Sequence, residues 1–262
     1  MTAGRQVLAD HVILATGGAS YPETGTRGEA LDWVSAIGIP IRPWFPALAP
    51  IPLKHPHPEW EGTALRGGTL CLLRGRTGKR LAQYPEDILF TRTGISGPAA
   101  LELSRTLEEA RREGPAWLGY AFTAKPGLDE ALQAEQRSNP HLAVRTWLQR
   151  HIPERLCPSV LATLRLATGQ RLKDLPRSSR QGLVDAVLTF PLGEPGPIVL
   201  ARGEVSAGGV CLAAVNPHTL MVKGWDNLRV CGELLDIDGP VGGYNLQAAF
   251  STSFLAGSSK AF

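Results

Sequence analysis

The chain has 262 residues, of which 43% are hydrophobic and 19% charged, with a formal net charge of +3. This composition is ordinary for a globular protein of one large or two modest domains. The small net charge gives no indication of nucleic-acid binding, and no apolar stretch approaches the ~20 residues that a membrane span needs. The four cysteines lack a Cys-x-x-Cys pair, so we expect buried neutral thiols in a cytoplasmic protein, with no metal site.

The first predicted element is a short strand that begins at Val12 and leads into Thr16, Gly17 and Gly18. Because the run is apolar without alternation, it is typical of a strand buried on both faces in a parallel sheet. Ligands of open α/β sheets bind beyond the carboxyl ends of the strands. We therefore expect Thr16, Gly17 and Gly18 to contact a cofactor, the alternative being a tight turn without a ligand.

The middle of the chain has a different character. A helix is predicted over residues 29–37, and short apolar runs with many glycines over 48–98 predict antiparallel strands, with a hairpin tip at 75–79. Residues 99–191 read as mostly helical. The basic residues around the tip could attract an anion, but a solvated hairpin explains them better; they are Arg74, Arg76, Lys79 and Arg80.

Two candidate catalytic patterns fail. The run from Gly94 to Pro98 resembles a nucleophile elbow, but Pro98 stands where Gly-x-Ser-x-Gly requires its last glycine, which argues against a serine hydrolase using Ser96. The histidines lack the spacing of a helical metal site. No catalytic acid or base is assigned.

The most informative stretch lies near the C-terminus, where a strand at 228–231 is followed by an acidic loop, Gly242, Gly243 and a helix. The helix has apolar residues at a 3.6-residue period, namely Leu246, Ala249, Phe250 and Phe254. Its N–H groups and positive dipole end suit an electron-rich group such as the pyrimidine edge of a flavin. The acidic residues disfavour phosphate and suit sugar or ribityl hydroxyls; they are Glu233, Asp236 and Asp238. The alternative is an ordinary glycine-rich loop.

Four segments together resemble the FAD-dependent flavoproteins of the aminoacetone-oxidase and YhiN-like group of NAD(P)/FAD-dependent oxidoreductases. They are Val12–Pro22, Leu89–Arg105, Glu204–Thr219 and Gly232–Gly257. The resemblance implies an α/β fold in which a partial FAD/NAD(P)-binding Rossmann-like domain is interrupted by an inserted β-plus-helix domain. It implies FAD-binding parts at 1–44 and 198–262 and a substrate domain at 45–197.

The resemblance also implies FAD as cofactor, NAD(P)H as a candidate electron donor and a small organic molecule as substrate. Glu233 would bind the ribityl hydroxyls, and Gly243, Tyr244 and Asn245 would present N–H groups to the pyrimidine edge. The expected cofactor contacts are Thr16, Gly17, Gly18, Gly232, Glu233, Asp236, Gly242, Gly243, Tyr244 and Asn245. Arg27, Glu29 and Ala30 depart from the family pattern, as does Arg92, which stands where histidine is common.

The Gly-x-Gly-x-x-Gly turn that opens such flavoproteins does not occur in the sequence. We therefore expect the C-terminal part of an oxidoreductase that lacks its N-terminal unit, with exposed strand edges, exposed apolar faces and weakened FAD affinity. The alternative is a non-enzymatic remnant or a module that binds a partner. The sequence determines neither the substrate nor the oligomeric state.

Overall fold

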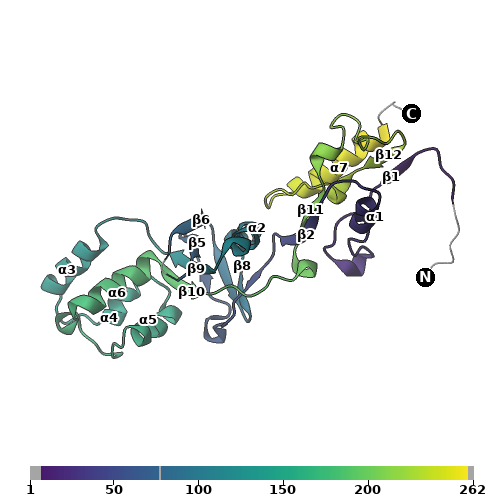
Figure 1. The fold of residues 1–262 in the computed structure, drawn as a ribbon. Coiled ribbons are helices and arrows are strands. Elements are labelled where there is room, and N and C mark those ends of the chain that lie inside the picture. Colours follow the sequence, from purple (N-terminus) through teal and green to yellow (C-terminus); the bar gives the residue numbers. More distant parts are fainter. Residues whose placement is uncertain (1–6, 77, 259–262) are drawn as a thin grey trace. The chain divides into compact units, whose positions relative to one another are not determined.

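The computed structural model describes residues 7–76 and 78–258, shown as a ribbon in Figure 1. The chain forms two compact units. We call Met1–Ala49 with Ile198–Phe262 the terminal unit, and Pro50–Pro197 the central unit. Helices and strands occur in both units, so the predicted α/β fold class is confirmed.

The described part of the terminal unit contains two strand pairs and two longer helices. Strand β1 (Val12–Leu14) pairs parallel with β12 (Leu228–Val230), so that Ile13 lies opposite Arg229. Strand β2 (Ile41–Ala47) pairs antiparallel with β11 (Val205–Val210). The helices are α1 (Ala30–Ala36) and α7 (Tyr244–Ser258), and the short 3-10 turns are η1 (Pro22–Thr24), η5 (Leu200–Arg202), η6 (Leu212–Ala214) and η7 (Gly232–Leu234).

The core of the terminal unit lies between α1 and the strands. Apolar side chains of α1 pack with residues of β11, β12 and η7 into one cluster, against which Leu14 and Trp44 also lie. The fully or nearly buried members include Leu31, Val34, Val210, Val230 and Leu234. This cluster fixes one face of the β1–β12 pair, because Leu228 and Val230 point to it while Arg229 points to the other face.

Two elements of this unit are more exposed than their sequences predict. Val12 and Ile13 of β1 are 41% and 40% exposed, so the prediction of a strand buried on both faces is wrong for β1. The physical reason is that, among the described residues, β1 has a strand neighbour only on its β12 side. On α7, Leu246, Phe250 and Phe254 are 66%, 69% and 75% exposed, whereas the small residue Ala256 is buried.

The described strands of the central unit form two four-stranded antiparallel sheets. One sheet has the order β10-β9-β5-β6 and the other the order β3-β8-β7-β4. Their bounds are β3 (Ile51–Pro52), β4 (Ala64–Leu65), β5 (Thr69–Arg74), β6 (Arg80–Tyr84), β7 (Ile88–Thr91), β8 (Gly94–Ser96), β9 (Ala116–Ala121) and β10 (Phe190–Gly193). The antiparallel strands predicted over 48–98 are therefore confirmed, as is the hairpin that joins β5 to β6.

The helices of the central unit follow the predicted region, with one exception. Strand β9 lies inside the stretch read as mostly helical, and it pairs along its whole length with β5 as an interior strand of the first sheet. The helices are α2 (Pro98–Glu113), α3 (Leu128–Ser138), α4 (Val144–Leu148), α5 (Cys157–Thr163) and α6 (Arg177–Leu188), with 3-10 turns η2 (Pro58–Trp60), η3 (Glu154–Leu156) and η4 (Leu172–Asp174). Figure 1 shows α3 to α6 gathered together.

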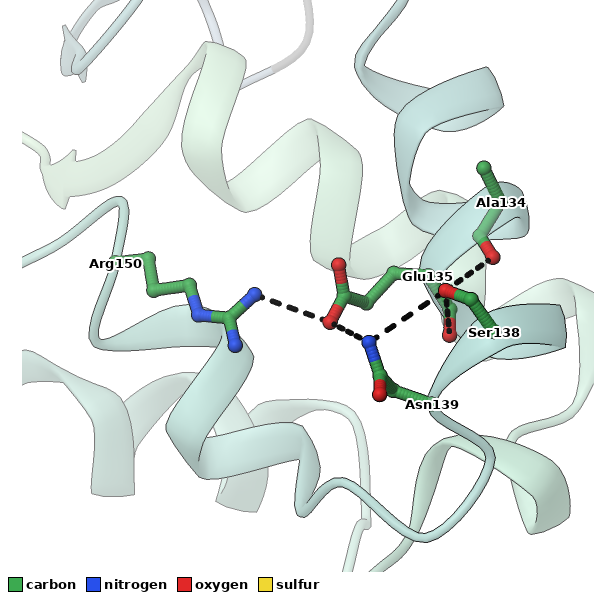
Figure 2. A network of polar contacts seen from close by, with 5 residues as sticks. All are labelled: Ala134, Glu135, Ser138, Asn139 and Arg150. Carbon is green, nitrogen blue, oxygen red and sulfur yellow. Dashed lines mark hydrogen bonds and ion pairs between the residues drawn. The ribbon is translucent and has the colours of Figure 1, made fainter.

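A polar network ends helix α3. Figure 2 shows the Glu135 carboxylate between Asn139, whose Nδ2 donates to it over 2.9 Å, and Arg150, whose Nη1 lies 3.2 Å away. Ser138 Oγ donates to the Ala134 carbonyl over 3.0 Å. The cap bond of α3 is made by the backbone, where the Asn139 N–H donates to the Glu135 carbonyl over 2.7 Å. The ion pair with Arg150 ties the end of α3 to the segment after α4.

No helix within residues 7–76 and 78–258 combines the length and the apolar character that crossing a membrane requires.

Candidate functional site

The loops that follow β1 and β12 lie side by side. The Cys231 N–H donates to the Leu14 carbonyl over 3.1 Å, which continues the parallel pairing one residue beyond the two strands. Since both strands run in the same direction, their carboxyl ends meet at one edge. The segment Thr16–Gly18 and the pair Gly232–Glu233 are thereby brought together from opposite ends of the chain.

Glu233 joins three segments of the terminal unit. Its Oε2 accepts a hydrogen bond from the Gly18 N–H at 3.3 Å, and its Oε1 accepts one from the Ser206 N–H at 2.8 Å. The side chain itself comes from η7, after β12. One partly buried carboxylate thus holds together the loop after β1, the start of β11 and the loop after β12.

Ser206 makes a second junction at the same place. Its Oγ accepts from the Ala19 N–H at 2.8 Å and from the Ser20 N–H at 2.9 Å, and lies 3.0 Å from Ser20 Oγ. A Cβ added to Gly18 would lie 2.8 Å from both Ser206 Oγ and Glu233 Cδ. Only glycine lets the chain pass this close to both side chains, which explains why residue 18 lacks a side chain.

The loop then folds back on itself. Thr26 Oγ1 donates to the Gly18 carbonyl over 2.5 Å, and Trp44 Nε1 donates to the Gly28 carbonyl over 3.2 Å. The Glu29 carboxylate accepts from the Arg27 N–H at 2.8 Å. Backbone hydrogen bonds at Glu29 and at Arg27 hold the pKa of Glu29 below its ordinary value. The Glu29 side chain therefore stabilises the loop through the local backbone.

The start of α7 is organised by Asn245. Its Oδ1 accepts from the Gly239 N–H at 2.7 Å, and its Nδ2 donates to the Gly239 carbonyl over 2.9 Å. Gly242 and Gly243 have φ angles of +128° and +85°, and a Cβ added to Gly243 would meet no atom within 4 Å. The first turn of α7 has no acidic residue, so its dipole and N–H groups are not neutralised there.

These elements surround two adjoining cavities in the terminal unit. The first, of about 360 Å³, lies beside the start of α7, and its wall includes Gly232, Gly242, Gly243 and Asn245. The second, of about 650 Å³, lies beside the loop after β1, and its wall includes Thr16, Gly17 and Gly18. Both are also lined by Tyr21, Glu204 and Glu233. The structure therefore brings eight of the ten predicted cofactor-contacting residues to one pair of cavities.

The remaining two predicted residues lie elsewhere. Asp236 forms an ion pair with Arg42, with 3.2 Å between Oδ2 and Nε, and lines neither cavity. The Tyr244 side chain is exposed and lies over Gly242, outside both walls. The Glu233 carboxylate lines both cavities, and it already accepts hydrogen bonds from two backbone N–H groups, those of Gly18 and Ser206.

Several lining residues had not been predicted, among them Glu204, Tyr21 and Leu48. Glu204 is exposed, and within the described part of the chain its carboxylate has neither a hydrogen bond nor an ion pair. Tyr21 and Leu48 have φ angles of +52° and +48°, which are uncommon for bulky residues. Glu204 is the first residue of Glu204–Thr219, one of the four segments that carry the family resemblance. Its position in that segment could have identified it as a candidate site residue. The backbone conformations of Tyr21 and Leu48 have no sequence signature.

Comparison with known proteins gives consistent results. The model of the HI0933-like protein Rossmann domain matches residues 1–259. A 3-dehydro-bile acid delta(4,6)-reductase of Clostridium scindens is 30% identical, with the alignment covering 97% of this chain and 63% of the relative. Ribosomal RNA dihydrouridine synthases of Escherichia coli and Haemophilus influenzae are both 26% identical, with coverage of 96% and 93% of this chain and 60% and 58% of the relatives. The chain thus spans about 60% of the length of these curated relatives.

Proposed function

Because the chain belongs to the family of HI0933-like proteins, an FAD-binding Rossmann family, we propose that its terminal unit binds FAD in the two adjoining cavities. The flavoprotein resemblance is confirmed at the level of this family. The narrower aminoacetone-oxidase group stays a prediction, since none of the relatives described above has that name.

The convergence of glycine-rich backbone on these cavities carries the proposal. Gly17, Gly232 and Gly243 each have a positive φ angle, and a Cβ added to any of them would meet no atom within 4 Å. Such backbone lets a flat ring or a ribityl chain approach closely. The first-turn N–H groups of α7 suit the electron-rich edge of a flavin. The residues present therefore fit the cofactor.

We assign different roles to the two acidic residues that line the cavities, Glu233 and Glu204. Glu233 fixes the loops through two backbone hydrogen bonds, so we assign it mainly to shaping the site. Glu204 lines both cavities with a carboxylate that has no partner among the described residues, and it is placed to accept hydrogen bonds from ribityl or ribose hydroxyls. Asn245 holds Gly239 and so positions the glycine pair that leads into α7.

We further propose that the reaction is the reduction of a carbon–carbon double bond conjugated with a carbonyl group. One relative is named a delta(4,6)-reductase of a 3-dehydro compound, and two are named dihydrouridine synthases. Both kinds of name describe the addition of hydrogen to a carbon–carbon double bond of a compound that also contains a carbonyl group. Bound flavin supplies the hydride chemistry, and NAD(P)H is the expected source of the electrons. A proton must also reach the product, and we assign no residue to that step.

Titration of the purified chain with FAD, followed by flavin fluorescence, tests the cofactor assignment. We expect saturable binding that Gly243→Val abolishes, because a branched side chain would enter the first cavity beside α7. Gly224→Val is the matched control: Gly224 has a φ angle of +84°, close to the +85° of Gly243, open space around it, and no place in either cavity wall.

The backbone strain of valine is therefore the same in both variants, and only the position differs. Retained FAD binding in Gly224→Val together with its loss in Gly243→Val supports the site. Equal binding by the two variants, or no binding by the unsubstituted chain, would overturn it.

A further inference from the structure

The central unit contains a cavity of its own. It has a volume of about 450 Å³, and its wall is formed mainly by residues of α5, α6, β9, β10 and η2. Thr163 and Asp185 in this wall are exposed, so the cavity opens to solvent. Its wall shares no residue with those of the two cavities in the terminal unit. Cavities that bind small molecules have volumes of roughly 300–1,000 Å³, so this one is large enough for a ligand.

Helix α6 presents small and polar residues to this cavity. Four lining residues follow one another at spacings of three, one and three positions, which places them on one face of the helix; they are Gly182, Asp185, Ala186 and Thr189. The large buried residues of α6, such as Leu183 and Val187, lie on the opposite face. Because a helix that covers a sheet normally fills the space with large apolar side chains, the lining face of α6 leaves room between helix and sheet.

Another part of the wall is aromatic and is held in place. The His57 ring stacks on the Trp60 ring, with 3.7 Å between the centroids and 17° between the planes. The Phe190 ring lies 5.4 Å from that of Trp60. Trp60 Nε1 donates to Ser159 Oγ over 3.3 Å, which fixes the indole relative to α5. Aromatic rings that are fixed in this way favour stacking or edge contact with another flat ring.

The charged groups of the wall restrict the kind of ligand. One carboxylate, Asp185, and one guanidinium, Arg76, line the cavity, so their charges cancel and a ligand with a net charge gains no advantage. Gln181 Nε2 donates to Asp185 Oδ1 over 2.9 Å, whereas Asp185 Oδ2 has no hydrogen bond or ion pair within the described part of the chain. This oxygen can therefore accept a hydrogen bond from an N–H or O–H group of a ligand.

We propose that this cavity binds a neutral planar ring compound that donates a hydrogen bond from its edge to Asp185. The face of the ring packs against the aromatic part of the wall, and the small residues of α6 provide the space for it. The proposal goes beyond the function proposed above, because the binding requires no flavin and no residue of the terminal unit.

The test uses the full chain without flavin and two neutral probes of the same ring size. 2-Naphthol has an O–H donor, and 2-methoxynaphthalene has the same rings without a donor. Isothermal titration calorimetry measures the affinity of each. We expect one molecule of either probe to bind per chain. 2-Naphthol should bind about fivefold more tightly, which is the modest gain expected from a hydrogen bond to an exposed carboxylate.

Two pairs of variants separate the hydrogen bond from the cavity itself. Asp185→Ala should remove the fivefold preference for 2-naphthol, whereas Asp174→Ala, which loses an equal charge outside the cavity wall, should keep it. Ala186→Phe adds a ring inside the cavity and should weaken both probes about tenfold or more, because apolar contact area is lost. Ala134→Phe adds the same ring to α3 outside the wall and should change either affinity less than about twofold.

Thermal unfolding verifies that the variants are folded, and Asp185→Ala tests the site without adding bulk. The proposal is overturned if neither probe binds, if Ala186→Phe binds both probes as the unsubstituted chain does, or if the preference for 2-naphthol persists in Asp185→Ala. Tighter binding of 2-naphthylmethylamine, a cation with the same rings, than of 2-naphthol would also overturn it, because the site would then select a positive charge.

Discussion

Replacement of Glu233 by glutamine tests whether this side chain holds the site together. Glutamine has nearly the same shape, but it has one acceptor oxygen and one NH₂ group. The oxygen can still accept from the Ser206 N–H, which is the shorter contact at 2.8 Å. The NH₂ group would then face the Gly18 N–H, 3.3 Å from the original Oε2, and that hydrogen bond would be lost.

The expected loss follows from the kind of bond. A hydrogen bond to a charged acceptor contributes roughly 1.5–3 kcal/mol to stability. Since Glu233 is partly exposed, we take the lower end, about 1.5 kcal/mol, which corresponds to roughly tenfold more frequent local opening. The effect should be confined to the loops around Gly18 and Ser206, because the carboxylate contacts these two segments.

Amide hydrogen exchange measured by NMR resolves this local effect. The Gly18 and Ser206 amides should exchange about tenfold faster in Glu233→Gln, while amides of β9 in the central unit serve as an internal reference. Glu204→Gln is the matched control, since it removes an equal charge from the same cavity walls without breaking a hydrogen bond among the described residues. Equal acceleration in the two variants would refute the role assigned to Glu233, because loss of negative charge alone would then explain the change.

Three further predictions concern stability and reactivity. Gly18→Ala should lower the free energy of unfolding by about 1–3 kcal/mol in urea titrations, because its Cβ would lie 2.8 Å from Ser206 Oγ; an unchanged midpoint would contradict the packing described here. Burial of the His151 imidazole lowers its pKa below 6.5, and the neighbouring charge of Arg150 lowers it further. As the pH drops, His151 therefore takes up its proton more readily in the unfolded chain than in the folded one. The free energy of unfolding should fall below about pH 6.5, and this fall should be less steep in His151→Gln. Burial raises the pKa of Cys157 to about 11 and also raises that of Cys71, so iodoacetamide at pH 8 should label only the partly exposed Cys211 before unfolding, as mass spectrometry can verify.

The sequence predicted the fold class and the strand-to-loop character of the site because both depend on local patterns. An apolar run ending in Thr16-Gly17-Gly18 and a glycine pair before a helix are visible without tertiary contacts. Strand β9 was missed because its surroundings are helical, and its identity depends on pairing with the distant β5.

Other features could not be read from sequence because they are set by packing across the chain. The 3.6-residue period of α7 indicates a helix but does not say which side is covered, and the outward position of Phe250 and Phe254 emerged only in the structure. Likewise, the acidity of Glu233 suggested contact with hydroxyl groups. Its two backbone partners come from segments 215 and 27 residues away, and no local pattern reveals them.

The connection between β2 and β11 has a consequence for how the chain can change over time. The Glu204 N–H donates to the Leu48 carbonyl over 3.2 Å, so the chain leaves the terminal unit and returns to it at neighbouring points. Everything between, Pro50–Pro197, is topologically a single long loop. Doubling such a loop adds only about 0.6 kcal/mol of closure entropy. Recombination could therefore lengthen, shorten or exchange the central unit with little effect on the cavities.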